Sequence, residues 1–362
     1  MGLPRRWEYL RVEVRDRRLN SKPVSWIGCL VFSGLVGIGL APTALAQTNA
    51  TAAKKPAATK RVVPRKPART TRAQRRAAAT AREMADTVVP RYKVDASGEL
   101  VPDLRAAAGI ILDVATGDVL WEENSESQRS IASITKVMTA TVVLESVPDL
   151  SQRVTVLRGD VYRASTTYLR RNDKPTVEDL LHLLLIASDN AAARVLARVS
   201  PFGSAGFIVR MNEKAAELGL KSTHYADPSG LLADNLSSAY DMAQLITLAS
   251  KDERIGSIMR KTEQTIQMPT RTITVRSTSR LLRDDEYDVL AAKTGFITRS
   301  GYCLATLLRL PQSGHEVALV VLGARSNAGR FRETQNLLSW FSSRVSTVFA
   351  TSAAAPPPQL PQ

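Results

Sequence analysis

The sequence predicts an α+β fold in which an antiparallel sheet is flanked by helices and an all-helical subdomain is inserted in the middle. The prediction rests on the order of the segments. Strand-like segments come first, at 108–122, a block of helical segments follows, and strand-like segments return at 271–323. An amphipathic helix at 327–345 closes the pattern. We expect the outer strands to pair in one sheet, the first and last helices to cover a face of it, and a cleft to separate the sheet from the helical block.

Local patterns justify each element. The turn Ala115-Thr116-Gly117-Asp118 joins the first two strands, and an apolar, β-branched run at 134–144 predicts a buried helix. Thr176 and Asp179 have the spacing of a capping box and predict the start of another helix. Further helices are predicted at 204–218, 238–250 and 253–261, and the later strands at 272–275, 287–296, 302–310 and 315–323.

The net charge of +15 is concentrated in the N-terminal part of the chain. Residues 1–24 hold seven Lys and Arg against three Asp and Glu, and residues 47–92 hold twelve against two. Residues 93–362 therefore carry a net charge of only +1. This balanced body argues against nucleic-acid binding, and no aromatic residue is interleaved with the basic ones at 47–90.

Residues 1–46 have the features of a signal peptide or an uncleaved anchor. A basic segment precedes an uncharged apolar run at 25–40, and Ala44-Leu45-Ala46 gives the small-x-small pattern of a cleavage site before Gln47. The sequence therefore predicts export to the periplasm.

Two further segments are expected to be disordered. Residues 47–104 form a basic arm rich in Ala, Lys, Arg and Pro, which cannot bury enough apolar surface to offset the entropy of ordering. The arm is either a solvated tether or an electrostatic attachment to the membrane or cell wall. The Pro-rich tail at 348–362 completes the chain after a domain at 105–347.

The cysteines and histidines indicate no metal site and no cofactor. Cys29 lies in the apolar N-terminal run, so Cys303 is the one cysteine of the body and no disulfide is expected there. His182, His224 and His315 are far apart in the sequence and lack metal-ligand spacing.

Ser133 and Lys136 are the first candidate catalytic pair. On a helix, residues three apart share a face, so the hydroxyl and the amine would lie together among apolar neighbours. Burial disfavours the charged form of a lysine and lowers its pKa. A neutral amine beside a hydroxyl can act as its base, although Ser-x-x-Lys by itself is a weak signal.

Three short motifs occur in one order: Ser133-Ile134-Thr135-Lys136, Ser188-Asp189-Asn190 and Lys293-Thr294-Gly295. They fall on a predicted helix, an interhelical break and a strand. This set is typical of the serine penicillin-recognising enzymes.

Residues 105–345 resemble the low-molecular-mass penicillin-binding proteins of the D-alanyl-D-alanine carboxypeptidase and endopeptidase family, most of all the penicillin-binding protein 7 type. The resemblance implies a fold like that of the β-lactamases and transpeptidases. The substrates would be peptidoglycan stem peptides, and β-lactams would be covalent inhibitors. The early end of the chain after the last helix favours the endopeptidase branch. Matching stretches lie at 183–193, 211–231, 235–245 and 289–305.

The resemblance also implies catalytic roles. Ser133 would be the nucleophile that forms an acyl-enzyme, and Lys136 would take its proton. Ser188 would pass that proton to the leaving amine, and Asn190 would hold Lys136 and a substrate amide.

Substrate-binding roles follow for the third motif. Lys293 would add positive potential, Thr294 would hydrogen-bond the substrate carboxylate, and Gly295 would let the substrate backbone approach the strand. The oxyanion hole would be the backbone N–H groups of Ser133 and Phe296.

The sequence also bears on three alternative functions. A class A β-lactamase needs a deacylating glutamate, and no Glu-x-x-Leu-Asn occurs between Asn190 and Lys293. An α/β-hydrolase needs Gly-x-Ser-x-Gly, which is absent from the sequence. A catalytically idle cell-wall-binding module, with the basic arm as its working part, stays open because only labelling by a penicillin separates it from an enzyme.

Overall fold

The computed structural model describes residues 71, 73–75, 77–78, 90–284, 286–310 and 314–353. The chain divides into two units, 1–67 and 68–362, and all described residues belong to the second. The predictions for residues 1–46, for most of the arm 47–104 and for the tail beyond residue 353 lie outside this description.

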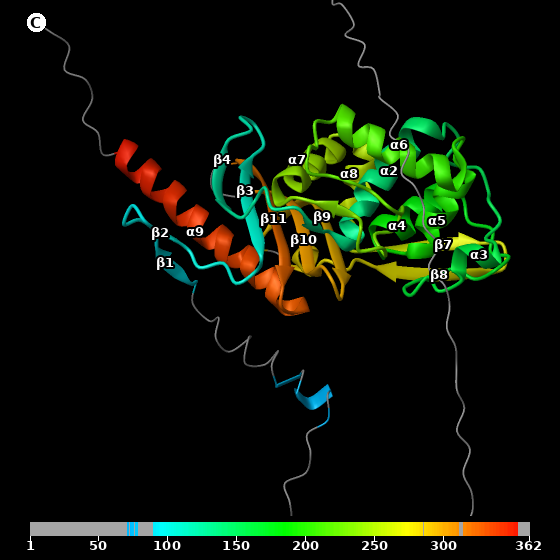
Figure 1. Ribbon diagram of the computed structural model, residues 1–362, viewed down its shortest axis with the longest axis horizontal. Helices are drawn as coiled ribbons and strands as arrows, with labels where there is room; N and C mark the ends of the chain where they lie inside the picture. Colours follow the sequence, from blue (N-terminus) through cyan, green and yellow to red (C-terminus); the bar gives the residue numbers. More distant parts are fainter. Residues whose placement is uncertain are drawn as a thin grey trace, which may run out of the picture. The chain divides into compact units, whose positions relative to one another are not determined.

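A five-stranded antiparallel sheet forms the centre of the fold, as predicted, and unites strands from both ends of the chain (Figure 1). The strand order is β4-β3-β11-β10-β9. Val320 of β11 pairs with Ile110 of β3 and with Ala305 of β10. The strand that comes last in the sequence, β11, therefore lies in the middle of the sheet. The strands are β3 (Ala108–Asp113), β4 (Val119–Glu123), β9 (Asp288–Ile297), β10 (Gly301–Arg309) and β11 (Glu316–Ala324).

Two apolar clusters cover the two faces of this sheet. On one face, Trp340 and Phe341 of α9 (Asn327–Ala353) pack with Leu319 and other residues of one side of the strands. On the other face, α7 (Ala239–Ser250) packs with the alternate residues, among them Val320. The period of two along each strand produces this division.

The first helix does not share a face with the last, contrary to expectation. The helix α2 (Thr135–Ser146) packs against α4, α5, α6 and α7, behind the layer that covers the sheet. The short turn before it, η1 (Ala132–Ile134), packs against β9 and β10. Ten of the eleven residues from 134 to 144 are buried, so α2 needs a helical environment on all sides rather than one sheet face.

The helical block between β4 and β9 contains most of the expected helices. Thr176 caps α4 through the predicted capping box with Asp179. The helices are α3 (Arg158–Val161), α4 (Val177–Leu185), α5 (Asn190–Val199), α6 (Gly203–Glu217), α7 and α8 (Glu253–Met259).

The inserted block is not all-helical, and this part of the prediction is wrong. It includes a hairpin of β7 (Glu263–Met268) and β8 (Arg271–Arg276), and the short pair β5 (Arg129–Ser130) and β6 (Leu236–Ser237). The alternating burial along 263–268 is a strand pattern, but it follows α8 so closely that the sequence analysis missed it.

The folded region extends beyond both predicted limits. Strands β1 (Tyr92–Val94) and β2 (Leu100–Pro102) form a hairpin in the segment assigned to the arm, and α9 continues to Ala353. Arg91 binds both carboxylate oxygens of Glu333 on α9, at 2.7 and 2.9 Å. The arm therefore ends before residue 90, because partners more than two hundred residues away order the segment that follows.

No helix in the described parts of the chain is long and apolar enough to cross a membrane.

Candidate active site

Ser133 lies in the turn η1, directly before the helix that carries Lys136. Ala132 enters this turn with φ +49, in the left-handed region, and Lys136 occupies the first turn of α2. The Ser133 side chain is half-buried, whereas Lys136 is fully buried. The spacing of three places Lys136 Nζ 3.0 Å from Ser133 Oγ, as the helical spacing predicts.

Lys136 Nζ has three hydrogen-bond partners. Besides Ser133 Oγ, it donates to Asn190 Oδ1 and to the Ser229 carbonyl oxygen, both at 2.6 Å. An amide oxygen and a carbonyl oxygen can only accept. When the amine is neutral, its two hydrogens therefore go to these two atoms, and its lone pair is directed at Ser133, the one partner that can donate.

Burial lowers the pKa of Lys136 to about 7. The nearby carboxylates of Asp227 and Asp189 oppose this effect, but removal of the amine from water outweighs them. A substantial fraction of Lys136 is therefore neutral at neutral pH, in a position to accept the hydroxyl proton of Ser133.

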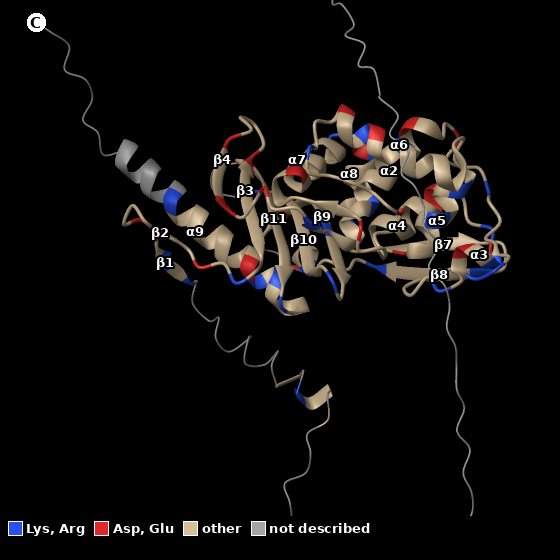
Figure 2. Ribbon diagram, viewed as in Figure 1, with Lys and Arg blue, Asp and Glu red and all other residues tan. Residues whose placement is uncertain are grey.

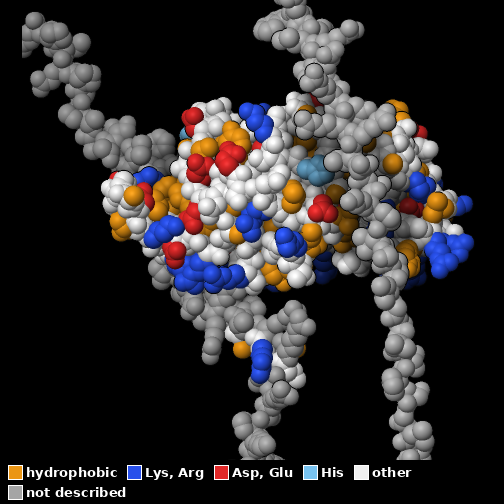
Figure 3. All heavy atoms as spheres, in the orientation of Figure 1, with side chains coloured by type: hydrophobic (Ala, Val, Ile, Leu, Met, Phe, Trp, Pro, Cys, Tyr) orange, Lys and Arg blue, Asp and Glu red, His pale blue; other side chains and the backbone are white. Residues whose placement is uncertain are grey.

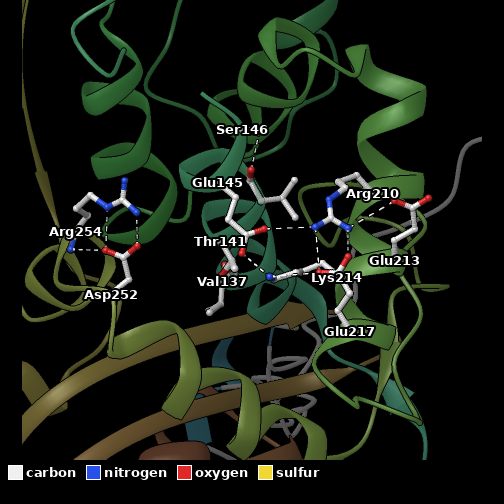
Figure 4. A network of polar contacts seen from close by, with 11 residues as sticks. Val137, Thr141, Glu145, Ser146, Arg210, Glu213, Lys214, Glu217, Asp252 and Arg254 are labelled. Atoms are coloured by element: carbon white, nitrogen blue, oxygen red, sulfur yellow. Dashed lines mark hydrogen bonds and ion pairs between the residues drawn. The ribbon is translucent and has the colours of Figure 1, made fainter. Parts of the chain in front are cut away.

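The far end of α2 is fixed by an ion-pair network with α6 (Figure 4). Glu145 contacts Arg210 at 3.5 Å and pairs with Lys214, and both cations also pair with Glu217. These contacts hold α2, which carries Lys136 at its other end, in position against α6. Helix α6 in turn packs against α5, which begins at Asn190.

The second motif forms the junction between α4 and α5. Ser188 has φ +58, and the Asp189 side chain caps α5 by accepting a hydrogen bond from the Ala192 N–H at 2.9 Å. Asn190 Nδ2 donates to the Ala164 carbonyl at 2.8 Å, which fixes the amide so that Oδ1 faces Lys136. The interruption predicted at 188–190 is therefore an ordered turn, which directs the side chain of Ser188 toward Lys293 and that of Asn190 toward Lys136.

The third motif lies on the edge strand β9. Lys293 is almost fully buried, and its Nζ donates to Ser188 Oγ at 2.9 Å and to the Thr294 carbonyl at 3.0 Å. Burial first, and then the positive charges of Lys136 and Arg330, hold the pKa of Lys293 well below its ordinary value. Lys293 is thus a weaker source of positive potential than expected, first because its amine is buried and then because Lys136 and Arg330 disfavour its charge.

Thr294 donates its hydroxyl proton to Thr278 Oγ1 at 2.6 Å. Phe296, whose backbone N–H is an expected oxyanion donor, is 47% exposed and stacks on Tyr302 with ring centroids 4.2 Å apart. Beneath them, the Arg330 guanidinium donates to the Gly295 carbonyl at 3.1 Å and lies 5.7 Å from the Tyr302 ring.

Two glycines allow other segments to approach the nucleophile turn. A Cβ on Gly295 would lie 2.7 Å from the Ile131 carbonyl oxygen and 3.1 Å from the Ser133 nitrogen. A Cβ on Gly230 would lie 2.0 Å from the Ala132 carbonyl oxygen. Gly295 was expected to make room for the substrate. In the structure its missing side chain makes room for the backbone beside Ser133.

The structure brings the three motifs together in two hydrogen-bonded groups. One contains Ser133, Lys136 and Asn190, and the other contains Ser188 and Lys293. The short separation between Gly295 and the Ser133 turn places the groups side by side.

The loop that completes the first group lies in a stretch that resembles the family, 211–231, but no role in the site was predicted for it. Asp227 accepts hydrogen bonds from the N–H groups of Ser229, Gly230 and Leu232 at 2.6 to 2.8 Å, and these bonds present the Ser229 carbonyl to Lys136. The Asp-Pro-Ser-Gly run is a turn signal. The sequence offered no sign that this turn would meet a residue more than ninety positions earlier.

Among the described residues, no group of three or more His, Cys, Asp or Glu side chains could hold a metal ion. The groups that the site brings together are hydroxyls, amines, an amide and backbone donors.

Comparison with known proteins places this site in context. Residues 95–326 match the family model described as D-alanyl-D-alanine carboxypeptidase. The chain is 33% identical over 243 residues to a D-alanyl-D-alanine endopeptidase of Escherichia coli, which covers 66% of this chain and 78% of that protein. It is 31% identical over 260 residues to the D-alanyl-D-alanine endopeptidase of Pseudomonas aeruginosa, covering 71% and 83%.

A solved structure shares the fold. The crystal structure of the Streptomyces K15 DD-transpeptidase superposes with a TM-score of 0.62 and 28% identity, covering 66% of this chain and 97% of that one. Both the antiparallel sheet and the flanking helices predicted from the sequence are confirmed.

Proposed function

This chain belongs to the D-alanyl-D-alanine carboxypeptidase family of serine hydrolases, and we propose that it cleaves D-alanyl-D-alanine bonds of peptidoglycan stem peptides through an acyl-enzyme at Ser133. The family resemblance inferred from the three motifs is confirmed. The observation that carries the proposed mechanism is the contact of Lys136 with Ser133, since the other two partners of the amine are acceptors.

In the proposed acylation, Ser133 Oγ attacks the carbonyl carbon of the penultimate D-alanine while its proton passes to Lys136 Nζ. The backbone N–H groups of Ser133 and Phe296 bind the oxyanion, each contributing on the order of 3 kcal/mol. The C–N bond then breaks, and the ester on Ser133 is later hydrolysed by water.

Ser188 relays the proton: its hydroxyl hydrogen passes to the leaving nitrogen, and the proton held by Lys136 replaces it. Its Oγ accepts a hydrogen bond from Lys293 Nζ, so its own hydroxyl hydrogen is free to be donated. Thr294 and Lys293 bind the substrate carboxylate, and the free edge of β9 aligns the substrate backbone. In this arrangement Thr294 exchanges its hydrogen bond with Thr278 for one with the substrate.

Labelling by a fluorescent penicillin tests this proposal. The wild type is expected to be labelled covalently, and Ser133→Ala is expected to lose the label. Ser146→Ala is the matched control, because Ser146 lies on α2 and its hydroxyl donates to the Val142 carbonyl, away from Lys136. Absence of label on the folded wild type would refute the enzyme and favour a wall-binding module.

Two bonds are candidates for cleavage: the terminal D-alanine bond and the cross-link between stem peptides. We favour the cross-link, because the relatives that match this chain over the largest share of their own length are named endopeptidases. Digestion of purified cell-wall fragments, followed by mass analysis of the products, distinguishes them. Released free D-alanine without loss of cross-linked dimers would instead assign carboxypeptidase activity.

The proposed place of action is the periplasm, with residues 1–46 as the export signal or anchor and the basic arm in contact with membrane or wall. The basis for this is the charge and hydropathy pattern of the N-terminal sequence together with relatives that act on D-alanyl-D-alanine bonds. Fractionation of cells that express the tagged chain tests the location.

A further inference from the structure

The segment 153–174, between α2 and α4, lies directly against the catalytic loop. The Asn190 N–H donates to the Thr166 carbonyl at 3.0 Å, and Asn190 Nδ2 donates to the Ala164 carbonyl at 2.8 Å. The Tyr168 N–H in turn donates to Asp189 Oδ2 at 2.6 Å. Whatever this segment binds is therefore held next to the residues that contact Lys136.

This segment carries a local surplus of positive charge. It has six Lys and Arg against two Asp in a body whose net charge is only +1. Both acids are buried and already paired with arginines from other elements: Asp160 with Arg198 of α5 at 2.9 Å, and Asp173 with Arg271 of β8 at 2.6 Å. Neither acid is left to neutralise the exposed cations.

Five exposed cations of this segment form what we call the basic rim: Arg158, Arg163, Arg170, Arg171 and Lys174. Within the described residues, none of the five forms an ion pair. Figure 2 shows several Lys and Arg positions along the ribbon near α3, and Figure 3 shows Lys and Arg side chains gathered at that end of the molecule. Two exposed tyrosines are interleaved with them, and the Arg163 guanidinium lies 5.3 Å from the Tyr162 ring centre.

The backbone that carries the basic rim is fixed rather than free. Arg194 of α5 donates to the Tyr162 carbonyl at 2.7 Å, and Arg271 donates to the Tyr168 carbonyl at 2.5 Å. Arg163, Ser165 and Asn172 have φ of +50, +62 and +71, which only a well-braced turn sustains in residues other than glycine. The cations are thus presented at set positions, which reduces the entropy lost when they bind.

We propose that the basic rim binds carboxylates that a peptide substrate carries outside its D-alanyl-D-alanine end. The proposal rests on the proposed function and names the substrate class it prefers: an anionic peptide rather than a neutral one. Charge complementarity carries it, since the cations are exposed, unpaired and set beside the loop of Ser188 and Asn190. Each exposed contact is weak, so the effect comes from several acting together.

Two synthetic peptides test the proposal. Both end in D-Ala-D-Ala, and one carries two further carboxylates that the other has as amides. The rim variant is Arg170→Gln/Arg171→Gln, and the matched control is Lys221→Gln/Lys251→Gln, which removes two exposed cations outside the rim. We expect the wild type to prefer the carboxylate peptide in kcat/KM, and the preference to shrink as NaCl is raised.

In the rim variant, we expect kcat/KM for the carboxylate peptide to fall about 3- to 10-fold. The amide peptide and the rate of penicillin labelling should stay unchanged, as should both peptides in the control variant. Equal losses on both peptides, or no loss on either, would overturn the proposal. Reduced binding to anionic lipid vesicles without a change in peptide preference would reassign the rim to a membrane. Failure of the wild type to cleave either peptide would instead count against the proposed function.

Discussion

Lys136 Nζ lies 3.0 Å from Ser133 Oγ, and the other two acceptors of this amine, on Asn190 and Ser229, cannot donate a hydrogen bond in return. The arrangement fixes the direction of the lone pair as well as the distance. The lone pair of the buried Lys136 amine is therefore directed at the Ser133 hydroxyl before any substrate binds.

Replacement of Lys136 by arginine separates the charge of this residue from its basicity. Lys136→Arg keeps a cation but cannot release its proton near neutral pH, so penicillin labelling should fall by at least about 10²-fold. Lys214→Arg is the matched control and should label normally, since Lys214 pairs with Glu145 and Glu217 at the far end of α2 from Lys136. Labelling of a folded Lys136→Arg variant near the wild-type rate would refute the assignment of the base.

The labelling rate should depend on pH through the protonation of Lys136. Its pKa of about 7 means that the reactive, neutral amine forms as pH rises, so the rate constant should increase through pH 7 and level off above it. Stability should also rise with pH between about 7 and 10.5, since there the unfolded chain binds a proton that the folded chain does not. A rate that is flat from pH 5 to 9 would contradict this view.

Asn190→Asp should move that pH dependence in a defined direction. A carboxylate 2.6 Å from Nζ stabilises the ammonium form and raises the pKa of Lys136, so the rising limb should shift to higher pH. At pH 7 labelling should fall at least about tenfold. Asn124→Asp, an exposed site whose amide bonds the Ala107 carbonyl, should leave the profile unchanged. A shift to lower pH would show that the Asn190→Asp substitution does not act through the charge of the new carboxylate.

Gly230 tests the packing of the Asp227 loop against the nucleophile turn. Gly230→Ala would place a Cβ 2.0 Å from the Ala132 carbonyl oxygen at a residue with φ +78, so the loop must move and labelling should be largely lost. Gly117→Ala has nearly the same φ, +80, but open space around its Cβ. It should cost about 1 kcal/mol of stability and leave the labelling rate unchanged. Equal labelling of the two variants would exclude the steric explanation.

The hairpin of β1 and β2 should contribute to the stability of the domain through Glu333. This carboxylate is nearly buried, binds Arg91 through both oxygens and accepts the Arg105 N–H at 3.0 Å. Glu333→Ala should lower the free energy of unfolding by about 3 kcal/mol, because it leaves a mostly buried guanidinium with only its longer contacts to Asp103, at 3.4 and 3.8 Å. Denaturant unfolding measures the change.

Glu263→Ala is the comparison for this experiment. Glu263 pairs with Arg276 at 3.4 Å on the surface, where both side chains are more than half exposed. Its loss should leave the unfolding midpoint close to that of the wild type. A similar effect of the two substitutions would mean that residues 90–104 are not anchored as the structure indicates.

Much of this fold and site followed from local patterns. The alternation of apolar residues identified the strands of the central sheet, Thr176 and Asp179 identified a helix start, and the order of the three motifs identified the family. These features depend on neighbours in the sequence, or on residue types that chemistry requires. They are therefore visible without a structure.

Other features depend on which segments meet in space. The β1–β2 hairpin carries few apolar residues and is ordered by α9, so its composition indicated disorder. The Asp227 loop has the sequence of an ordinary turn, and only the fold shows that it contacts Lys136. The segment of the basic rim has the sequence of an ordinary charged loop, and only the fold shows that it contacts Asn190.

The sequence by itself determined the chemistry of this protein: a serine, a lysine and their partners, in an order typical of the serine penicillin-recognising enzymes. The tertiary structure decided which state those groups adopt. Burial at the meeting of α2, the Asp227 loop and β9 removes water from two lysines, lowers the pKa of both, and leaves Ser133 as the one donor that faces Lys136. Desolvation is a property of the whole packed domain, and for that reason no short motif could specify it.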